Sequence, residues 1–192
     1  MTRWAPDAAL RLEAAALDLV AEQGYAATTV PQITHRAGLT TRTFFRHFAD
    51  KRDVFFLRDR EFPRVVAAAL EGLPAETAPL AALQQGLERA TSPLAQWREP
   101  ILRRRAVIRA EDQLRERELL KSGHLADAIA EALVARSRPG TEVTPAEARL
   151  LASVAVLVFD RALDSWLDGP PLSPLSAHLA DAWRDLAALF GP

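Results

Sequence analysis

The chain has 192 residues, of which 49% are hydrophobic and 26% charged, and its formal net charge is −1. This composition is typical of a globular protein of one or two domains, and its charge excludes a uniformly polycationic surface. No cysteine is present, which excludes disulfides, thiolate catalysis and zinc sites built on cysteine. No signal peptide is expected, and the longest apolar run, residues 150–159, is shorter than the roughly 20 residues that span a bilayer. We therefore expect a cytoplasmic protein that does not associate with membranes.

The first predicted helix carries apolar residues at helical spacing on one face: Leu12, Ala16, Leu19 and Val20. Gly24 follows this helix at a position where a left-handed cap is common. Thr29 is expected to cap a second, short helix, with Gln32 as its capping-box partner. Pro31 is tolerated there because it lies in the first turn, and the helix is expected to end at Gly38.

A third helix is predicted over residues 41–47, with Thr40 as its N-cap. Phe44 and Phe48 share one face and are expected to pack this helix onto the first two. The surrounding side chains carry hydroxyl or cationic groups: Thr40, Thr41, Arg42, Thr43, Arg46 and His47. Two short helices with a glycine-containing turn between them are typical of a helix-turn-helix, which places its second helix in the major groove of DNA.

Local charge supports this interpretation, because residues 34–52 contain five lysine or arginine residues and a single acid. Arg42 could bind a guanine edge through two hydrogen bonds. Lys51 is suited to a phosphate at the start of the next helix, and Thr28 and Thr29 to one at the second helix. Taken singly, the threonines could equally be ordinary caps, and the charges could simply face water.

Asp50 is expected to cap a fourth helix, with Asp53 as its N3 acid. This helix is predicted to run from Lys51 to Glu71, with a kink or break at Pro63. Further helices are predicted over residues 79–91, 99–112, 115–137, 145–168 and 174–190. Strand signals are nearly absent, so the fold class is predicted to be all-α.

Two of the C-terminal helices have well-marked starts. Thr144, Pro145 and Glu147 form a capping box with proline at the first helical position. Ser173 precedes Pro174 and is expected to act as an N-cap in the same way.

The motifs Gly24-Tyr25, Thr28-Thr29-Val30, Ala37-Gly38-Leu39, Thr43-Phe44-Phe45-Arg46-His47-Phe48 and Lys51 occur in an ordered series. With them, residues 10–58 resemble the DNA-binding domain of TetR-type transcriptional regulators. The resemblance implies that Thr29, His47 and Lys51 hold phosphates, and that residues 40–43 approach bases or phosphates. The predicted DNA-contacting residues are Thr28, Thr29, Thr40, Thr41, Arg42, Thr43, Phe45, Arg46, His47 and Lys51.

Two positions depart from the family pattern. Phe45 stands where the family usually has tyrosine, so a phenolic hydroxyl that often binds phosphate is missing. Pro31 stands where the family often has arginine, which removes one potential base contact. We expect both changes to weaken or redirect DNA binding without abolishing it.

The resemblance also implies a helix-turn-helix domain over residues 1–50 and a helical bundle for ligand binding and dimerisation over residues 51–192. Apolar residues of the last two helices are the predicted homodimer interface: Leu151, Val154, Val158, Leu175, Leu179, Trp183, Leu186 and Phe190. The apolar stripe of the last helix supports this interface independently. The alternative is that both helices form the core of a monomer.

A small-molecule effector would bind among the helices of residues 79–168. The candidate walls are Trp97, Arg105, Ile108, Leu125, Phe159 and Trp166, although such side chains are also the ordinary interior of a helical bundle. The arginines at positions 103–105 and 109 either face this pocket, where they could bind an anionic ligand, or are solvated or paired with nearby acids.

The resemblance as a whole implies a ligand-responsive repressor that binds a palindromic operator on double-stranded DNA as a homodimer and is released by a small molecule. The alternative is a dimeric DNA-binding or scaffold protein that senses nothing. An enzyme is not expected, because the four histidines lack metal-ligand spacing and no nucleophile elbow or phosphate-binding glycine loop is present. No metal or cofactor is expected.

Overall fold

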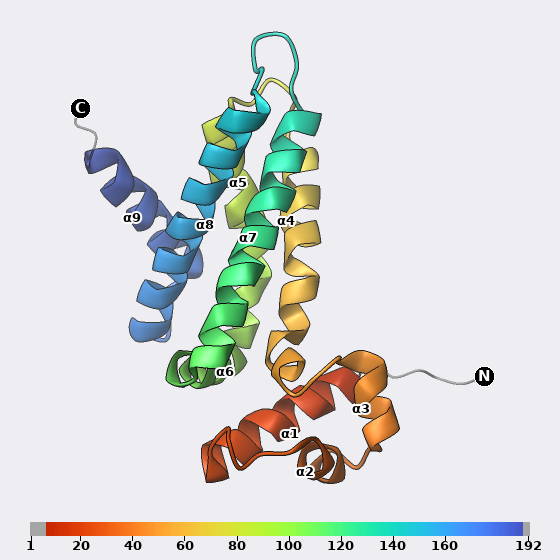
Figure 1. Cartoon of the computed structure of the whole chain (residues 1–192). Coiled ribbons are helices and arrows are strands. Elements are labelled where there is room, and N and C mark those ends of the chain that lie inside the picture. Colours follow the sequence, from red (N-terminus) through yellow and green to blue (C-terminus); the bar gives the residue numbers. More distant parts are fainter. Residues whose placement is uncertain (1–6, 190–192) are drawn as a thin grey trace. The chain divides into compact units, whose positions relative to one another are not determined.

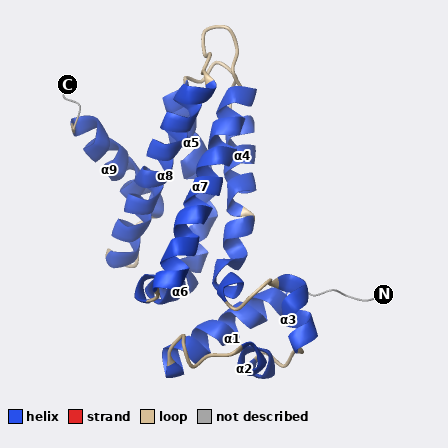
Figure 2. Cartoon of the chain, in the orientation of Figure 1, coloured by secondary structure: helices blue, strands red, loops and turns tan. Residues whose placement is uncertain are grey.

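The computed structural model describes residues 7–189, apart from the side chains of residues 7 and 58–60, and every regular element within that range is a helix (Figure 2). In chain order the elements are α1 (Asp7–Gln23), α2 (Val30–Arg36), α3 (Thr41–His47), the 3₁₀ segment η1 (Arg52–Arg60), α4 (Phe62–Glu71), α5 (Pro79–Thr91), the 3₁₀ segment η2 (Ser92–Trp97), α6 (Arg98–Ala110), α7 (Asp112–Ala135), α8 (Pro145–Asp168) and α9 (Leu175–Ala188) (Figure 1). The predicted all-α fold is confirmed. No helix in this range is both long and apolar enough to cross a membrane.

The chain divides into two compact units, and neither is continuous in sequence. The N-terminal unit combines the residues up to Arg60 with the segment 99–118. The C-terminal unit consists of residues 61–98 and the chain from Leu119 onward. The assignment of DNA binding to residues 1–50 and of ligand binding and dimerisation to residues 51–192 concerns function, and it remains a prediction.

Local capping explains why α2 and α3 begin where they do. The Thr29 hydroxyl accepts from the Gln32 backbone N–H at 3.4 Å, and the Gln32 side chain accepts from the Thr29 N–H at 2.8 Å. Thr40 caps α3 by accepting from the Thr43 N–H at 3.1 Å. Each such cap stabilises a helix by about 1 kcal/mol. Gly38, with φ of +63°, makes the turn between the two helices.

The fourth predicted helix is interrupted, as its proline indicated. Asp50 accepts from the N–H groups of Arg52 and Asp53, at 2.8 and 3.1 Å, and so caps η1. The α-helix begins only at Phe62, the first residue of α4, and Pro63 lies in its first turn. The predicted continuous helix is therefore a 3₁₀ segment followed by a separate α-helix.

The two predicted C-terminal caps have different outcomes. The Thr144–Glu147 capping box at α8 is confirmed. The predicted cap at Ser173 is wrong, because Pro174 is the N-cap of α9 and makes no side-chain capping hydrogen bond. The Ser173 hydroxyl instead lies 2.7 Å from Nε2 of His178. A side chain of α9, five residues along the chain, is therefore the partner of this hydroxyl group in place of the backbone N–H.

The core of the N-terminal unit gathers apolar side chains from all of its helices. Phe44 and Phe48 are almost fully buried, with ring centroids 5.3 Å apart. They share a cluster with Leu12 and Ile33, and this cluster also contains Ile108 from α6. Burying each such side chain stabilises the fold by about 1.5–3 kcal/mol. The core thus fixes α3 by one face only.

In the C-terminal unit, α4 packs on α5, and α8 packs on α9 (Figure 1). Phe62 and Phe159 stack with ring centroids 5.1 Å apart. Arg98 donates to the carbonyls of Leu167 and Gly169, at 2.8 and 2.9 Å, and thereby holds the end of α8. A cation at the C-terminal end of a helix is favourable because it complements the helix dipole.

Candidate nucleic-acid interface

Helix α3 presents a polar and cationic face away from the core of its unit. Phe44 is fully buried, whereas the side chains that surround it on the other face are exposed. The exposed residues are Thr41, Arg42, Phe45 and Arg46. A helix held on one side by apolar packing, with cations on its other side, has the form required to enter a major groove.

The threonines of this region do not all reach the surface in the same way. Thr40 is exposed, but its hydroxyl caps α3 and lies 3.0 Å from the hydroxyl of the half-buried Thr43. Thr28 is buried, and its hydroxyl donates to the Gly24 carbonyl at 2.8 Å. The Thr28 side chain therefore lies inside the turn that precedes α2, whereas Thr41 lies on the surface.

Lys51 closes the same turn from the other side. Its Nζ donates to the carbonyls of Tyr25 and Thr28, at 2.9 and 2.8 Å, and lies 3.9 Å from the centroid of the Tyr25 ring. Burial lowers the pKa of Lys51, because the charged ammonium loses water. The geometry shows an ammonium that fixes the backbone ahead of α2. Contacts of Lys51, Thr29 and His47 with phosphate remain predictions.

Part of the local positive charge is neutralised within the unit. Arg36 makes two hydrogen bonds of 2.6 Å with the Glu22 carboxylate, and Arg52 binds Asp50 at 2.8 Å. Arg42 and Arg46 are the exposed arginines of α3 itself. Both therefore lie on the surface of the helix that forms the candidate interface.

The predicted effector walls lie among packed side chains. Ile108 is in the core of the N-terminal unit, Phe159 stacks on Phe62, and Leu125 is buried. Trp166 is buried and donates through Nε1 to the Ser173 carbonyl at 2.9 Å. Arg105 lies 3.5 Å from Glu118, and Trp97 is half-buried. Their role in effector binding remains a prediction.

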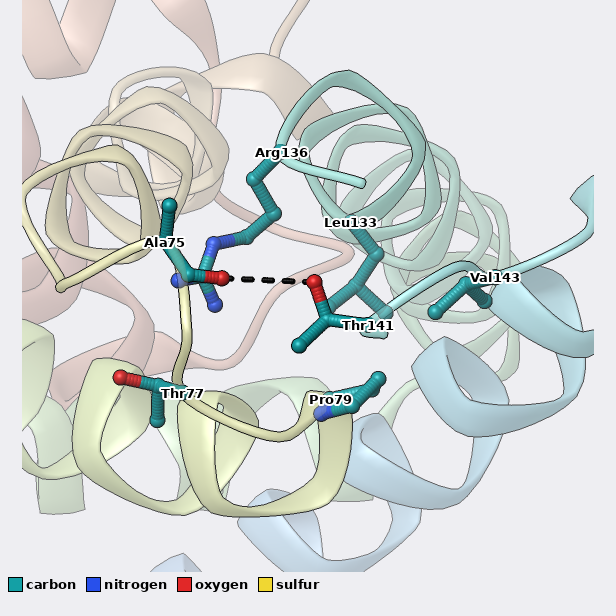
Figure 3. A pocket seen from close by; sticks show the side chains of 7 residues that line it. All are labelled: Ala75, Thr77, Pro79, Leu133, Arg136, Thr141 and Val143. Carbon is teal, nitrogen blue, oxygen red and sulfur yellow. Dashed lines mark hydrogen bonds between the residues drawn. The ribbon is translucent and has the colours of Figure 1, made fainter. Parts of the chain in front are cut away.

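One small cavity of the C-terminal unit lies between two loops (Figure 3). The Thr141 hydroxyl donates to the Ala75 carbonyl at 3.3 Å, and Arg136 donates to the Pro74 carbonyl at 2.6 Å. The cavity has a volume of about 10 Å³, which is room for one water molecule at most. The two hydrogen bonds hold the loops together. The cavity between them is too small for an effector.

Two larger hollows occur in the same unit. One, of about 420 Å³, lies between α5 and α9, and the other, of about 300 Å³, lies between α4 and α7. Half of the residues that line the second are alanines, and three of the others are charged, namely Arg64, Glu71 and Glu131. None of the six predicted wall residues lines either hollow.

The residues predicted for a dimer interface divide by burial. Four of them are buried within the single chain: Val158, Leu175, Leu179 and Trp183. Three are half-buried, namely Leu151, Val154 and Leu186. Phe190 lies outside the described residues. Leu150 and Leu157, which are not among the predicted interface residues, are 67% and 69% exposed on α8. The signal for them was their seven-residue spacing in a run that is apolar except at Ser153.

Together, the tight turn, the capped α3 and its exposed polar face form a helix-turn-helix, a motif that DNA-binding proteins use to enter the major groove. Residues 12–56 match the family described as bacterial regulatory proteins of the tetR family. This match confirms the predicted resemblance of the N-terminal residues to the DNA-binding domain of TetR-type regulators.

One known regulator and two solved structures are similar to this chain. The HTH-type transcriptional regulator TcmR of Streptomyces glaucescens is 44% identical over 68 residues, a match that spans 35% of this chain but only 30% of TcmR. The fold resembles FadR of Bacillus subtilis in complex with stearoyl-CoA, with a TM-score of 0.63, 17% identity and coverage of 92% of this chain and 96% of that one. It also resembles Thermus thermophilus FadR in complex with lauroyl-CoA, with a TM-score of 0.58, 20% identity and 93% coverage of both chains.

Proposed function

We propose that this protein is a repressor that binds a palindromic operator as a homodimer and releases it when a small molecule binds the C-terminal unit. The observation that carries the proposal is the exposed face of α3, where Arg42 and Arg46 stand opposite the buried Phe44. Arginine side chains on such a helix can bind guanine edges and phosphates.

Exposed apolar residues support the homodimer. Leu150, Val154 and Leu157 lie at positions i, i+4 and i+7 of α8, and the two leucines are largely exposed. An apolar stripe of this kind is stabilised when another helix covers it. A second copy of α8, related by two-fold symmetry, would bring the same stripe to both sides of the interface.

The fold supports an effector of small-molecule class. The two FadR proteins of similar fold are described in complex with acyl-CoA molecules. In this chain the hollow of about 420 Å³ between α5 and α9 falls within the size range of small-molecule sites, and that of about 300 Å³ between α4 and α7 lies at its lower limit.

Fluorescence anisotropy with the intergenic DNA beside the gene tests the proposal. The wild-type protein is expected to bind at modest salt, and Arg42→Ala to weaken binding by about 5- to 150-fold, which corresponds to 1–3 kcal/mol. Arg138→Ala, which removes an exposed arginine of the loop before α8, is the matched control and should bind like the wild type. Absence of binding to any duplex would contradict the proposal. DNA binding that no small molecule weakens would favour the non-sensing alternative.

A further inference from the structure

Phe45 is an apolar residue in the middle of the exposed face of α3. Its side chain is 59% exposed, and its ring packs edge-to-face on Phe44 with centroids 5.4 Å apart and an interplanar angle of 81°. Phe44 is fully buried, so this contact anchors one side of the Phe45 ring. The rest of the ring remains accessible.

The neighbours of Phe45 on this face carry polar groups. Thr41 and Arg42 precede it by four and three residues, so both lie beside it on the helix surface, and both are exposed. Arg46 follows directly and is also exposed. The face therefore consists of one aromatic ring surrounded by cations and a hydroxyl group, and its charge is complementary to duplex DNA.

Given the proposed function, on which this inference rests, we propose that Phe45 recognises a thymine through its C5-methyl group. A phenylalanine ring has no hydroxyl or amide, so it cannot hydrogen-bond a phosphate or a base edge. In the major groove the thymine methyl is the apolar group that the standard base pairs offer. Arg42 and Arg46 would hold the helix in the groove, and the ring would then bury the methyl group.

Wedging of the ring between base pairs is a different mode of binding. Side chains that unstack base steps act from the minor groove and bend the duplex. A helix of the α3 type lies in the major groove, where the accessible ring surface meets base edges. Phe45 therefore adds specificity for a base, whereas a tyrosine at the same position would add a hydrogen bond to phosphate.

The test uses the full-length protein and a duplex that it selects from a random pool. Each thymine of the selected duplex is then replaced singly by uracil, which lacks only the methyl group. At one position in each half-site we expect uracil to weaken wild-type binding about fourfold, the value of one buried methyl group. Phe45→Ala should bind the thymine and uracil duplexes equally at that position.

Two further variants sharpen the result. Phe45→Leu keeps an apolar surface and should retain part of the preference for thymine, whereas the control variant Arg138→Ala should keep all of it. Melting temperatures close to that of the wild type show that each variant folds. If the wild type and Phe45→Ala respond identically to uracil at every position, the inference is wrong while the DNA-binding function stands. If no duplex is selected, both are wrong.

Discussion

Lys51 is placed where one side chain controls the start of the DNA-binding helices. Its ammonium group bridges the carbonyls of Tyr25 and Thr28, and the second of these residues precedes the N-cap of α2 directly. Partial burial strengthens these hydrogen bonds and also lowers the pKa of the lysine. The position of α2, and through it of α3, thus depends on a contact made by a residue beyond both helices.

Lys51→Met preserves the aliphatic stem and removes the donor. The Thr28 carbonyl then loses this donor, and the Tyr25 carbonyl keeps only the Thr28 N–H at 3.2 Å, so the free energy of unfolding should fall by about 1–3 kcal/mol. Urea denaturation followed by circular dichroism measures this loss, and DNA affinity should fall with it. Lys51→Arg, which retains a cationic donor, should recover part of both. Equal stability of Lys51→Met and the wild type would show that these hydrogen bonds contribute nothing.

At the scale of elements, α2 and α8 begin with the same motif built from different acceptors. Thr29 pairs with Gln32, whereas Thr144 pairs with Glu147. The backbone and side chain of Thr144 both donate to the Glu147 carboxylate, and these hydrogen bonds lower its pKa. The capping box of α8 therefore depends on pH through the Glu147 carboxylate, whereas that of α2 uses the amide of Gln32, which does not ionise.

Glu147→Gln gives the capping box of α8 the same residue types, threonine and glutamine, as the capping box of α2. Because the pKa of Glu147 is lower in the folded chain than in the unfolded one, its contribution is fully present above the unfolded value of about 4.3 and is lost as pH falls through the folded value. The wild type should melt above Glu147→Gln at neutral pH, and this difference should shrink towards pH ~3.5. Gln32→Ala should lower the melting temperature by a similar amount at both pH values. A difference between wild type and Glu147→Gln that grows on acidification would contradict this account.

Asp53 links two segments of the N-terminal unit that are distant in sequence. Its carboxylate accepts from the Ala49 N–H at 2.8 Å and pairs with Arg117 of α7, and its side chain is only 2% exposed. Arg117→Met leaves the buried carboxylate without this partner and should cost about 3–5 kcal/mol of stability. Asp53→Ala leaves a partly exposed arginine and removes the acceptor of the Ala49 N–H, and should cost about 1–3 kcal/mol. In a double-mutant cycle by urea denaturation, the double variant should lose less stability than the sum of the two single losses. Additive losses would show that the pair is not coupled.

Local patterns predicted local structure well. The caps at Thr29, Thr40 and Thr144 depend on neighbours three residues away, so the sequence alone indicates them. Ser173 was mispredicted because His178, five residues on, bonds its hydroxyl group. The burial of Ile108 in a core that also contains Leu12 was not predictable, because no local pattern records it.

The exposed face of α3 was also predictable from the spacing of residues within the helix. Once the i, i+4 pair Phe44 and Phe48 is buried, the helical period turns Arg42 and Phe45 outward. The buried state of Thr28 was not predictable, since it depends on the path of the chain around Gly24. Predictions of exposure are thus reliable within a helix and weaker in the turns between helices.

At the scale of the whole molecule, the charge of −1 means that attraction to DNA is local. Two exposed arginines on one short helix give modest affinity, because each neutralised phosphate contributes a limited, salt-dependent amount. Two copies of α3 on half-sites about 34–36 Å apart would combine their affinities, since binding of the first copy raises the effective concentration of the second. Operator affinity should therefore depend on dimerisation as strongly as on α3 itself.

Leu150→Glu combined with Leu157→Glu tests this dependence. Both leucines are exposed on one stripe of α8, so the variant should fold, whereas two carboxylates in a dimer interface would lose hydration without gaining partners. Light scattering after size exclusion should show a monomer, and operator affinity should fall about 10²–10⁴-fold. Leu80→Glu, at an exposed apolar residue of α5, is the control and should remain dimeric. A double variant that is still a dimer would place the interface elsewhere, and a monomer with undiminished affinity would mean that α3 binds its site singly.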